Sequence, residues 1–224
     1  MRIVTALFLF VCLISCDESR EPTPETLGYD FYPIQIGQYR IYDVEEINYK
    51  LTGFDTTVYQ LRETIFDSIV SADQTSYLIR RDKRENATET WDSDSVWMVT
   101  KTSNFLSISE NNIPFIKLVF PVKVGQTWDG NSLNSRDATT YYYQNVEEAI
   151  IDSVSTSNHV RLIIEDIPRN VVNQDERSEI YARGVGLVEK SYLTLNFCTV
   201  NCGQLNEIEG GRFLHQVLIE AGNE

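Results

Sequence analysis

Few residues in this 224-residue sequence have the types and spacing that catalysis or metal binding requires. The two histidines, His159 and His215, each lack a cysteine or a second histidine at ligand spacing. The segment 92–96, DSDSV, begins like a calcium loop, but Val96 stands where an oxygen ligand is needed and the distal Glu is missing. Motifs of serine hydrolases, phosphate-binding loops and zinc proteases are absent from the sequence. We therefore predict no catalytic residue, no metal site and no cofactor.

Two weaker sources of chemistry remain open. Carboxylates are abundant, but a glycosidase-like pair is defined by the distance between two carboxyl groups, and no motif here fixes it. The three tryptophans and the run Tyr141-Tyr142-Tyr143 offer rings that stack on sugars or apolar ligands. On a strand, Tyr141 and Tyr143 share one face and Tyr142 takes the other. At least one face of this run is therefore expected in the core.

Residues 1–15 have the layout of a secretory signal. Arg2 gives a positive start, residues 3–14 form an apolar run that is short for a membrane span, and Ser15 is a small residue at the cleavage position. The tetrapeptide LISC at 13–16 resembles a bacterial lipobox, which implies cleavage before Cys16 and diacylglycerol on its sulfur. Several acyl chains anchor a protein stably. Ordinary cleavage beside a chance cysteine is the alternative.

Residues 16–27 read as a tether from the lipidated Cys16. They carry an acidic cluster and two prolines without apolar periodicity. An acidic cluster after the acylated cysteine resembles the export signal of surface lipoproteins in the Bacteroidota. That resemblance implies the outer membrane, with the domain on the cell surface. A solvated spacer facing the periplasm is the alternative.

Cys198 and Cys202 enclose three residues and are followed by Gly203, which suits a disulfide closing a turn. Either compartment outside the cytoplasm is oxidising and favours that bond. A zinc pair would need two further ligands, and no His or Cys lies nearby in sequence. We predict a Cys198–Cys202 disulfide with modest stabilisation, because the loop it closes is short.

Four tripeptides consist of Asp, then Ser or Thr, then a β-branched residue. They resemble the Asp-Ser/Thr-aliphatic motif of periplasmic O-glycosylation in the Bacteroidota. A turn that leads into a strand is the alternative, because Asp and Ser hydrogen-bond to nearby backbone groups. The candidate acceptors are Thr56, Ser68, Ser95 and Ser153.

The sequence after the tether predicts strands. Segments such as 39–44, YRIYDV, and 160–165, VRLIIE, alternate with a period of two and are rich in β-branched and aromatic residues. Short polar turns separate these segments, and connections this short favour antiparallel neighbours. We predict an all-β antiparallel meander that forms a strongly curved sheet or a barrel-like single domain. The sequence does not decide between a closed barrel and an open sheet.

Two segments recur along the chain. Residues 32–38, YPIQIGQ, return as 120–126, FPVKVGQ, with Pro, Gly and Gln identical. Residues 63–69, ETIFDSI, return as 148–154, EAIIDSV. We predict that residues 28–224 are one internally duplicated β domain with halves at about 28–113 and 114–224. Chance reuse of turn and strand sequences is the alternative.

Three stretches together, 32–44, 111–131 and 179–190, resemble a family of uncharacterised outer-membrane lipoproteins of the Bacteroidota. The resemblance implies a lipid-anchored β domain in the cell envelope. It supplies no catalytic residues to transfer.

We therefore expect a non-enzymatic envelope lipoprotein that binds a small ligand, a glycan or an envelope protein, with the membrane as its partner through the anchor. The net charge of −14 opposes nucleic-acid binding, because phosphates need cationic partners. An envelope hydrolase with paired carboxylates and a structural subunit of a surface assembly are the alternatives. A deep apolar cavity would favour small-ligand binding, converging carboxylates an enzyme, and a flat apolar patch an assembly.

Overall fold

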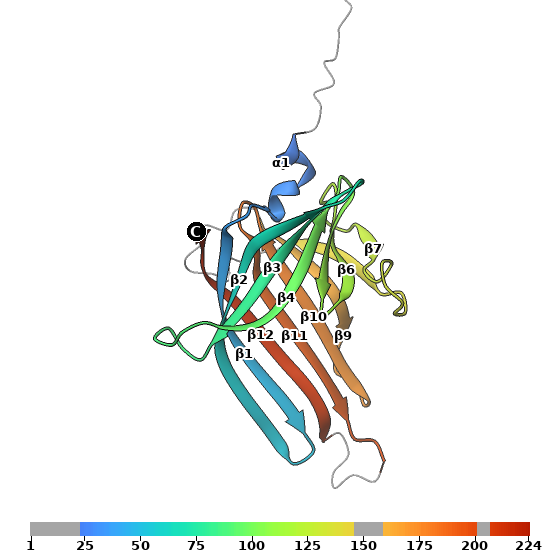
Figure 1. Ribbon diagram of the computed structural model, residues 1–224. Helices are drawn as coiled ribbons and strands as arrows, with labels where there is room; N and C mark the ends of the chain where they lie inside the picture. The colour runs from blue at the N-terminus through green and yellow to red at the C-terminus, as the bar shows by residue number, and fades with distance from the viewer. Residues whose placement is uncertain (1–22, 146–158, 201–206) are drawn as a thin grey trace, which may run out of the picture.

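The computed structural model describes residues 23–145, 159–200 and 207–224 (Figure 1). Two short helical segments come first, α1 (Pro24–Leu27) and the 3-10 turn η1 (Tyr29–Phe31). The next six elements are β1 (Gln38–Lys50), β2 (Gly53–Val70), β3 (Thr75–Arg84), β4 (Asp92–Lys101), β5 (Phe105–Glu110) and β6 (Ile113–Val119). Six more follow: β7 (Thr127–Asp129), β8 (Thr140–Asn145), β9 (His159–Ile167), β10 (Asn173–Ala182), β11 (Gly186–Phe197) and β12 (Ile208–Asn223).

These twelve strands form one sheet in the order β6-β5-β4-β3-β2-β1-β12-β11-β10-β9-β8-β7. Each strand pairs antiparallel with the next strand in the chain except at β6 and β7, and β1 also pairs antiparallel with β12. The sheet curls strongly, so that β2, β3 and β4 cross in front of β10, β11 and β12 (Figure 1). The predicted all-β class and the antiparallel meander are confirmed, with β6 and β7 as the two edges.

The two edge strands meet and nearly close the sheet into a barrel. Ile116 N–H donates to Gly130 O at 3.0 Å, and Trp128 Nε1–H donates to Ile116 O at 2.9 Å. The Tyr143 hydroxyl accepts from Val119 N–H at 2.8 Å and donates to Val119 O at 3.0 Å. These bonds satisfy backbone groups of an edge strand that would otherwise be free to pair with another chain.

The repeated heptapeptide forms the same turn before β1 and before β7. Gly37 and Gly125 both have positive φ, 91° and 81°, which glycine adopts without a Cβ clash. Gly37 N–H donates to Ile65 O at 2.8 Å, and Gly125 N–H donates to Tyr143 O at 2.9 Å. In both copies the next N–H donates to the carbonyl three residues earlier at 3.0 Å. The two segments therefore form the same turn at Gly37 and Gly125, but they differ at their prolines, where the Phe120–Pro121 peptide bond is cis and the Tyr32–Pro33 bond is not.

The second repeated segment, 148–154, lies outside the described residues, so its equivalence with 63–69 stays a prediction. The turn hydrogen bonds instead make Tyr143 in β8 the counterpart of Ile65 in β2. The first six described strands end with β6, which begins at Ile113. The predicted halves at about 28–113 and 114–224 therefore stay a prediction.

Apolar and aromatic side chains fill the end of the barrel that faces α1 (Figure 1). Phe31 and Tyr32 are buried there beneath the helical segments. Lys101 holds residues 29–32 in place, because its Nζ donates to Tyr29 O at 2.7 Å and to Tyr32 O at 2.6 Å. Other buried members of this core include Tyr42, Leu61, Ile65, Ile79, Leu106, Leu118, Leu162, Ile164 and Tyr181.

The tyrosine run alternates as predicted. Tyr141 and Tyr143 are buried in the interior, whereas Tyr142 is half-exposed on the opposite face of β8. Tyr143 also closes the seam with β6. The buried pair therefore belongs to the core and offers no platform for sugars.

The interior changes from apolar to charged with distance from α1. On β1, buried Tyr42 is followed at an inward position by Glu46, which lines a cavity. On β3, buried Ile79 is followed by Arg81, which lines the same cavity. Side chains just fill a barrel of eight strands, so a barrel of twelve is wide enough to leave space between them.

Candidate functional site

Four charged side chains meet inside the barrel, and we call Glu110, Lys117, Glu179 and Lys190 the charged cluster. Lys117 Nζ lies 2.8 Å from Glu179 Oε1 and 3.0 Å from Glu110 Oε1. Lys190 Nζ lies 3.3 Å from the same two oxygens. β5 and β6 are far from β10 and β11 in the order of the sheet, so these contacts cross the lumen. The charged cluster therefore joins two opposite walls.

Two tyrosines add hydrogen bonds to the Glu179 carboxylate. The Tyr181 hydroxyl donates to Glu179 Oε2 at 2.5 Å, and the Tyr192 hydroxyl donates to Glu179 Oε1. Tyr192 also accepts from Lys117 Nζ at 3.3 Å. Charges removed from water need such a full set of partners, because their desolvation is costly.

Three members of the charged cluster, Glu110, Lys117 and Glu179, have pKa values shifted in the direction that keeps them charged. Burial alone would lower the pKa of Lys117, but the carboxylates of Glu110 and Glu179 raise it well above its usual value. Burial alone would raise the pKa of Glu179, but Lys117 and Lys190 lower it. Burial and the Glu179 carboxylate raise the pKa of Tyr181 well above its usual value, so this tyrosine stays a neutral donor.

Two carboxylates thus converge, as the hydrolase alternative requires, but their environment does not suit acid catalysis. A general acid in a glycosidase needs a raised pKa. The same two ammonium groups contact Glu110 and Glu179, and the pKa of each carboxyl is lowered. The geometry therefore favours binding and structure over hydrolysis.

Two cavities flank the charged cluster, with volumes of about 270 and 200 Å³. Both are lined by Glu110, Asn111 and Tyr192. A deep apolar cavity would have favoured small-ligand binding, but charged side chains line these two cavities. Its cationic groups are Arg81, Lys83, Lys117, Arg136, Arg177, Lys190 and Arg212, and its anionic groups are Glu46, Asp94 and Glu110.

The larger cavity contains two polar donors that the described residues leave without a hydrogen bond. Trp97 Nε1 and Gln216 Nε2 are both buried, and both residues line this cavity. The Gln216 residue is only 3% exposed. A buried donor without an acceptor costs about 1–3 kcal/mol. Neither atom is reached by solvent, so both are unsatisfied groups within the wall of the cavity and not donors that face its open space.

Arg81 lies over the Trp97 ring, with its Cζ 3.7 Å from the ring centroid. Its Nε donates to Glu63 Oε1 at 3.0 Å. Its Nη1 is 3.9 Å from Asp94 Oδ2, beyond hydrogen-bond distance. The Glu63 and Asp94 carboxylates thus fix the orientation of the guanidinium.

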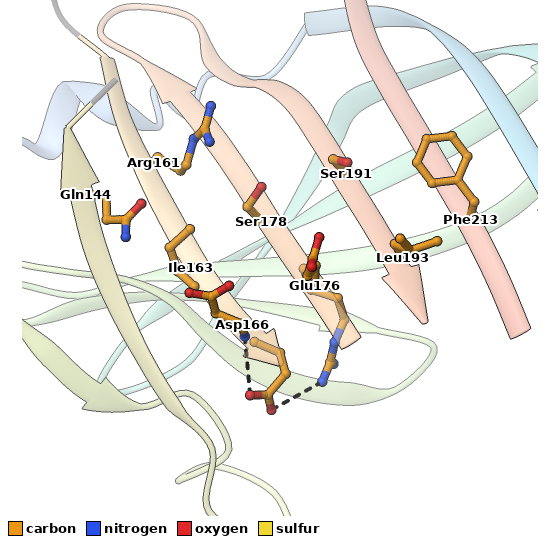
Figure 2. Close-up of a pocket in the computed structure, with 11 residues that line it drawn as sticks. Gln144, Arg161, Ile163, Asp166, Glu176, Ser178, Ser191, Leu193 and Phe213 are labelled. Carbon is orange, nitrogen blue, oxygen red and sulfur yellow. Dashed lines mark hydrogen bonds and ion pairs between the residues drawn. The ribbon is translucent and has the colours of Figure 1, made fainter. Parts of the chain in front are cut away.

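A separate hollow of about 410 Å³ lies on the outer face of β8 to β12 (Figure 2). Ser178 and Ser191 lie near its middle, with Phe213 toward one end (Figure 2). Ser178 precedes Glu179 in β10, so strand alternation places it on the outside. Arg161 Nε, also in this groove, is buried without a hydrogen bond from the described residues. The outer groove lies on one wall of the sheet, whereas the lumen cavities lie between two walls that the charged cluster joins, so the lumen is the better candidate.

The candidate glycosylation acceptors that the structure describes lie inside strands. Thr56 is exposed on β2, and Ser68 is half-exposed on the same strand. Ser95 is half-exposed on β4, where its hydroxyl donates to Asp94 Oδ2 at 2.9 Å. None of the three lies in a turn before a strand, which was the alternative interpretation. Ser153 lies outside the described residues, and all four acceptors stay predictions.

Both cysteine predictions involve residues outside the described part of the chain. Cys16 and Cys202 are not described, and Cys198 is buried just after β11. The lipidation and the disulfide therefore stay predictions. Within residues 23–145, 159–200 and 207–224, no three His, Cys, Asp or Glu side chains gather as metal ligands. Over the same ranges, no helix has the length and apolar character to cross a membrane.

The charged cluster was not predicted, although the sequence contains a signal for it. Lys117 interrupts the apolar segment 115–120, FIKLVF, at an inward position. Glu179 and Lys190 are the first and last residues of the segment 179–190, which indicated only a resemblance to a lipoprotein family. A charged residue at a position that period-two alternation assigns to the interior indicates a buried partner.

Known proteins add little to this geometry. No protein-family model and no curated protein matches the sequence. Among solved structures, a Bacteroides fragilis protein with a YmcC-like fold is similar, at a TM-score of 0.42 and 14% identity over 86% of this chain and 99% of that one. A similarity of this size assigns no ligand, activity or location. The lipoprotein family therefore stays a resemblance.

Proposed function

We propose that this protein is a lipid-anchored protein of the outer membrane that binds a small molecule inside its barrel and does not transform it. The observation that carries the proposal is the pair of cavities between opposite walls of the sheet. Small-molecule sites are concave and hold polar groups at defined positions. Both cavities share these features, and their lining is more charged than that of most such sites.

The construction of the interior supports this role. The end near α1 is packed with apolar side chains, which gives the barrel a rigid core. The charged cluster then fixes the distance between the walls at the level of the cavities. A site held by rigid elements binds with less loss of conformational freedom than one built from loops.

The N-terminal sequence supports the location. The LISC tetrapeptide places Cys16 directly after an apolar signal, and the acidic residues that follow fit a tether to the domain. In Figure 1 the first described residues lie at the α1 end of the barrel. A tether entering there leaves the charged half of the lumen at the far end.

The assembly alternative has one observation in its favour. The outer face of β2 exposes Phe54 and Val58, at 65% and 64%. Leu51 adds a third exposed apolar side chain at the β1–β2 turn. These are three side chains on one strand and its turn, whereas the cavities are lined by residues from two walls, so binding is the function that the geometry supports best.

Native mass spectrometry of the full-length protein, extracted from membranes in mild detergent, tests the proposal. Leu214→Trp fills the larger lumen cavity, and Leu193→Trp makes the same change in the outer groove. We expect the wild type and Leu193→Trp to carry a small molecule that Leu214→Trp lacks. Circular dichroism verifies that both variants fold.

Two results would overturn the proposal. One is a wild-type mass that equals the protein alone under every mild extraction. The other is a small molecule that Leu193→Trp loses and Leu214→Trp keeps, because that result places binding in the outer groove.

A further inference from the structure

We propose that the outer groove on β8 to β12 is a second binding site, and that its ligand is a neutral carbohydrate. The groove is separate from the lumen, because Ser178 faces the groove and Glu179, the next residue in β10, faces the lumen. This inference therefore does not depend on the proposed function.

The shape of the groove comes from two small side chains at its middle. Ser178 and Ser191 are directly paired across β10 and β11 (Figure 2). In the next row of the same face, Glu176 pairs with Leu193, and both of these side chains are longer than serine. The volume of about 410 Å³ lies within the range of about 300–1,000 Å³ that small-molecule sites span.

The uncharged polar side chains of the groove indicate the type of ligand. The hydroxyls of Ser178 and Ser191 face open space, because neither oxygen is buried, and neither has a hydrogen bond from the described residues. The side-chain amide of Gln144 also has none from the described residues. Hydroxyl and amide groups both donate and accept, as sugar hydroxyls do, whereas a carboxylate only accepts and an ammonium only donates. A ligand with many hydroxyls therefore matches these groups best.

An aromatic ring at one end of the groove favours a sugar as well. Phe213 is half-buried and pairs across the strands with Leu193. Its ring stacks with His215, two residues further along β12, with the centroids 6.1 Å apart. Gly211, two residues in the other direction, has no side chain, so this side of the ring has no neighbour from its own strand. The electron-rich face of an aromatic ring attracts the C–H groups of a sugar ring.

The arginines of the groove do not make it an anion site. Three acidic side chains line it against two cationic ones, Arg161 and Arg177. Arg177 is already held by Asp175 at 2.7 Å and by Glu165 at 3.7 Å. An anionic ligand would therefore meet an excess of negative charge.

Two carboxylates of the groove supply further acceptors. Glu176 accepts a hydrogen bond from Gln174 at 3.1 Å, and Asp166 accepts one from Tyr142 at 3.4 Å. An ionised carboxylate has about four acceptor positions, so both keep positions for a ligand. Hydroxyl groups donate strongly to carboxylates. A sugar can therefore bond to these acids and to the serines together.

The test uses the methyl NMR signals of the full-length protein in phosphocholine micelles, which carry no sugar headgroup that competes for the site. Ile163 and Leu193 report on the groove, and Leu214 in the larger lumen cavity is the control. Ile163→Val, Leu193→Met and Leu214→Met identify the three sets of signals. The neutral probes are tetrasaccharides of glucose, mannose, xylose and N-acetylglucosamine, and the charged probes are anionic tetragalacturonate and cationic tetraglucosamine.

We expect at least one neutral tetrasaccharide to shift the Ile163 and Leu193 signals saturably while the Leu214 signals stay fixed. Tetragalacturonate should bind more weakly, because the acids of the groove repel it. Tetraglucosamine should bind no more tightly than the neutral probe.

Variants of the groove locate the contacts. The double variant Ser178→Ala/Ser191→Ala should weaken binding at least about 5-fold, because two hydroxyl partners are removed. Phe213→Ala should weaken it by about 3–10-fold. Phe54→Ala removes an exposed ring on β2, outside the groove, and should leave the affinity unchanged. The dispersion of the methyl signals verifies that each variant folds.

The inference is overturned if no neutral tetrasaccharide shifts the two groove signals, if either charged probe binds more tightly than every neutral one, or if the serine double variant or Phe213→Ala binds as the wild type does. The groove is open along one wall, so we expect its ligand to exchange with solvent and to be lost on purification. A molecule that the purified wild type retains and Leu214→Trp loses would therefore support the lumen site even when the groove binds no sugar.

Discussion

Replacing Lys117 by Met should destabilise the protein far more than removal of an exposed lysine. Lys117 and Glu179 are 3% and 1% exposed at their side chains, and the change leaves the carboxylates of Glu110 and Glu179 facing Lys190 alone. Breaking a buried ion pair by removing one partner costs about 3–5 kcal/mol, because a buried charge is left uncompensated. The Met side chain keeps most of the volume, so the loss reports on charge.

Lys50→Met is the matched control. Lys50 pairs with Asp55 at the β1–β2 turn, where the two side chains are 64% and 68% exposed. An exposed pair of this kind contributes at most about 1 kcal/mol.

Urea denaturation at pH 7, followed by circular dichroism, measures both changes. With a slope of about 2–3 kcal/mol per M, the midpoint should fall by about 1–2.5 M for Lys117→Met and by at most about 0.5 M for Lys50→Met. The double variant Lys117→Met/Glu110→Gln should recover part of the loss, because one ammonium then faces one buried carboxylate. Equal midpoints for the two single variants would refute the reasoning.

Further predictions concern pH, a donor and the two cysteine sites. The pKa values of Glu110 and Glu179 are lowered from the usual 4.5, so their ionised forms contribute stability above about pH 4.5. The urea midpoint should therefore fall as the pH drops below about 4.5, and an unchanged midpoint at pH 3 would contradict this. Gln216→Leu removes an unpartnered buried donor and should raise the unfolding free energy of the ligand-free protein by about 1 kcal/mol in the same assay, whereas a large loss would indicate an unseen structural partner. Cys16→Ala should release the protein from the membrane fraction, and continued retention would refute the anchor. Mass spectrometry of the unreduced protein should show two hydrogens missing, and free thiols at Cys198 and Cys202 would refute the disulfide.

The sequence predicted the sheet because its evidence is local. Alternation placed Tyr141 and Tyr143 on one face and Tyr142 on the other, and in the structure the pair lies in the core. The repeated heptapeptide contains a local signal as well, because it forms a turn twice with positive φ at Gly37 and Gly125. Period and turn chemistry were therefore sufficient for the strands and their antiparallel order.

The site could not be predicted because its evidence is non-local. Lys117 and Glu179 come from β6 and β10, and their contact depends on how far the sheet curls. Curling depends on bulges and on the seam between β6 and β7, and neither has a short sequence signature. The unpartnered donors of Trp97 and Gln216 are visible only when every neighbouring acceptor is placed.

The most direct test of the central claim is a high-resolution crystal structure of the protein purified with its anchor from a Bacteroidota host. The account predicts the density of a bound small molecule in a cavity between the two walls of the barrel. Cavities that contain ordered water alone would contradict it.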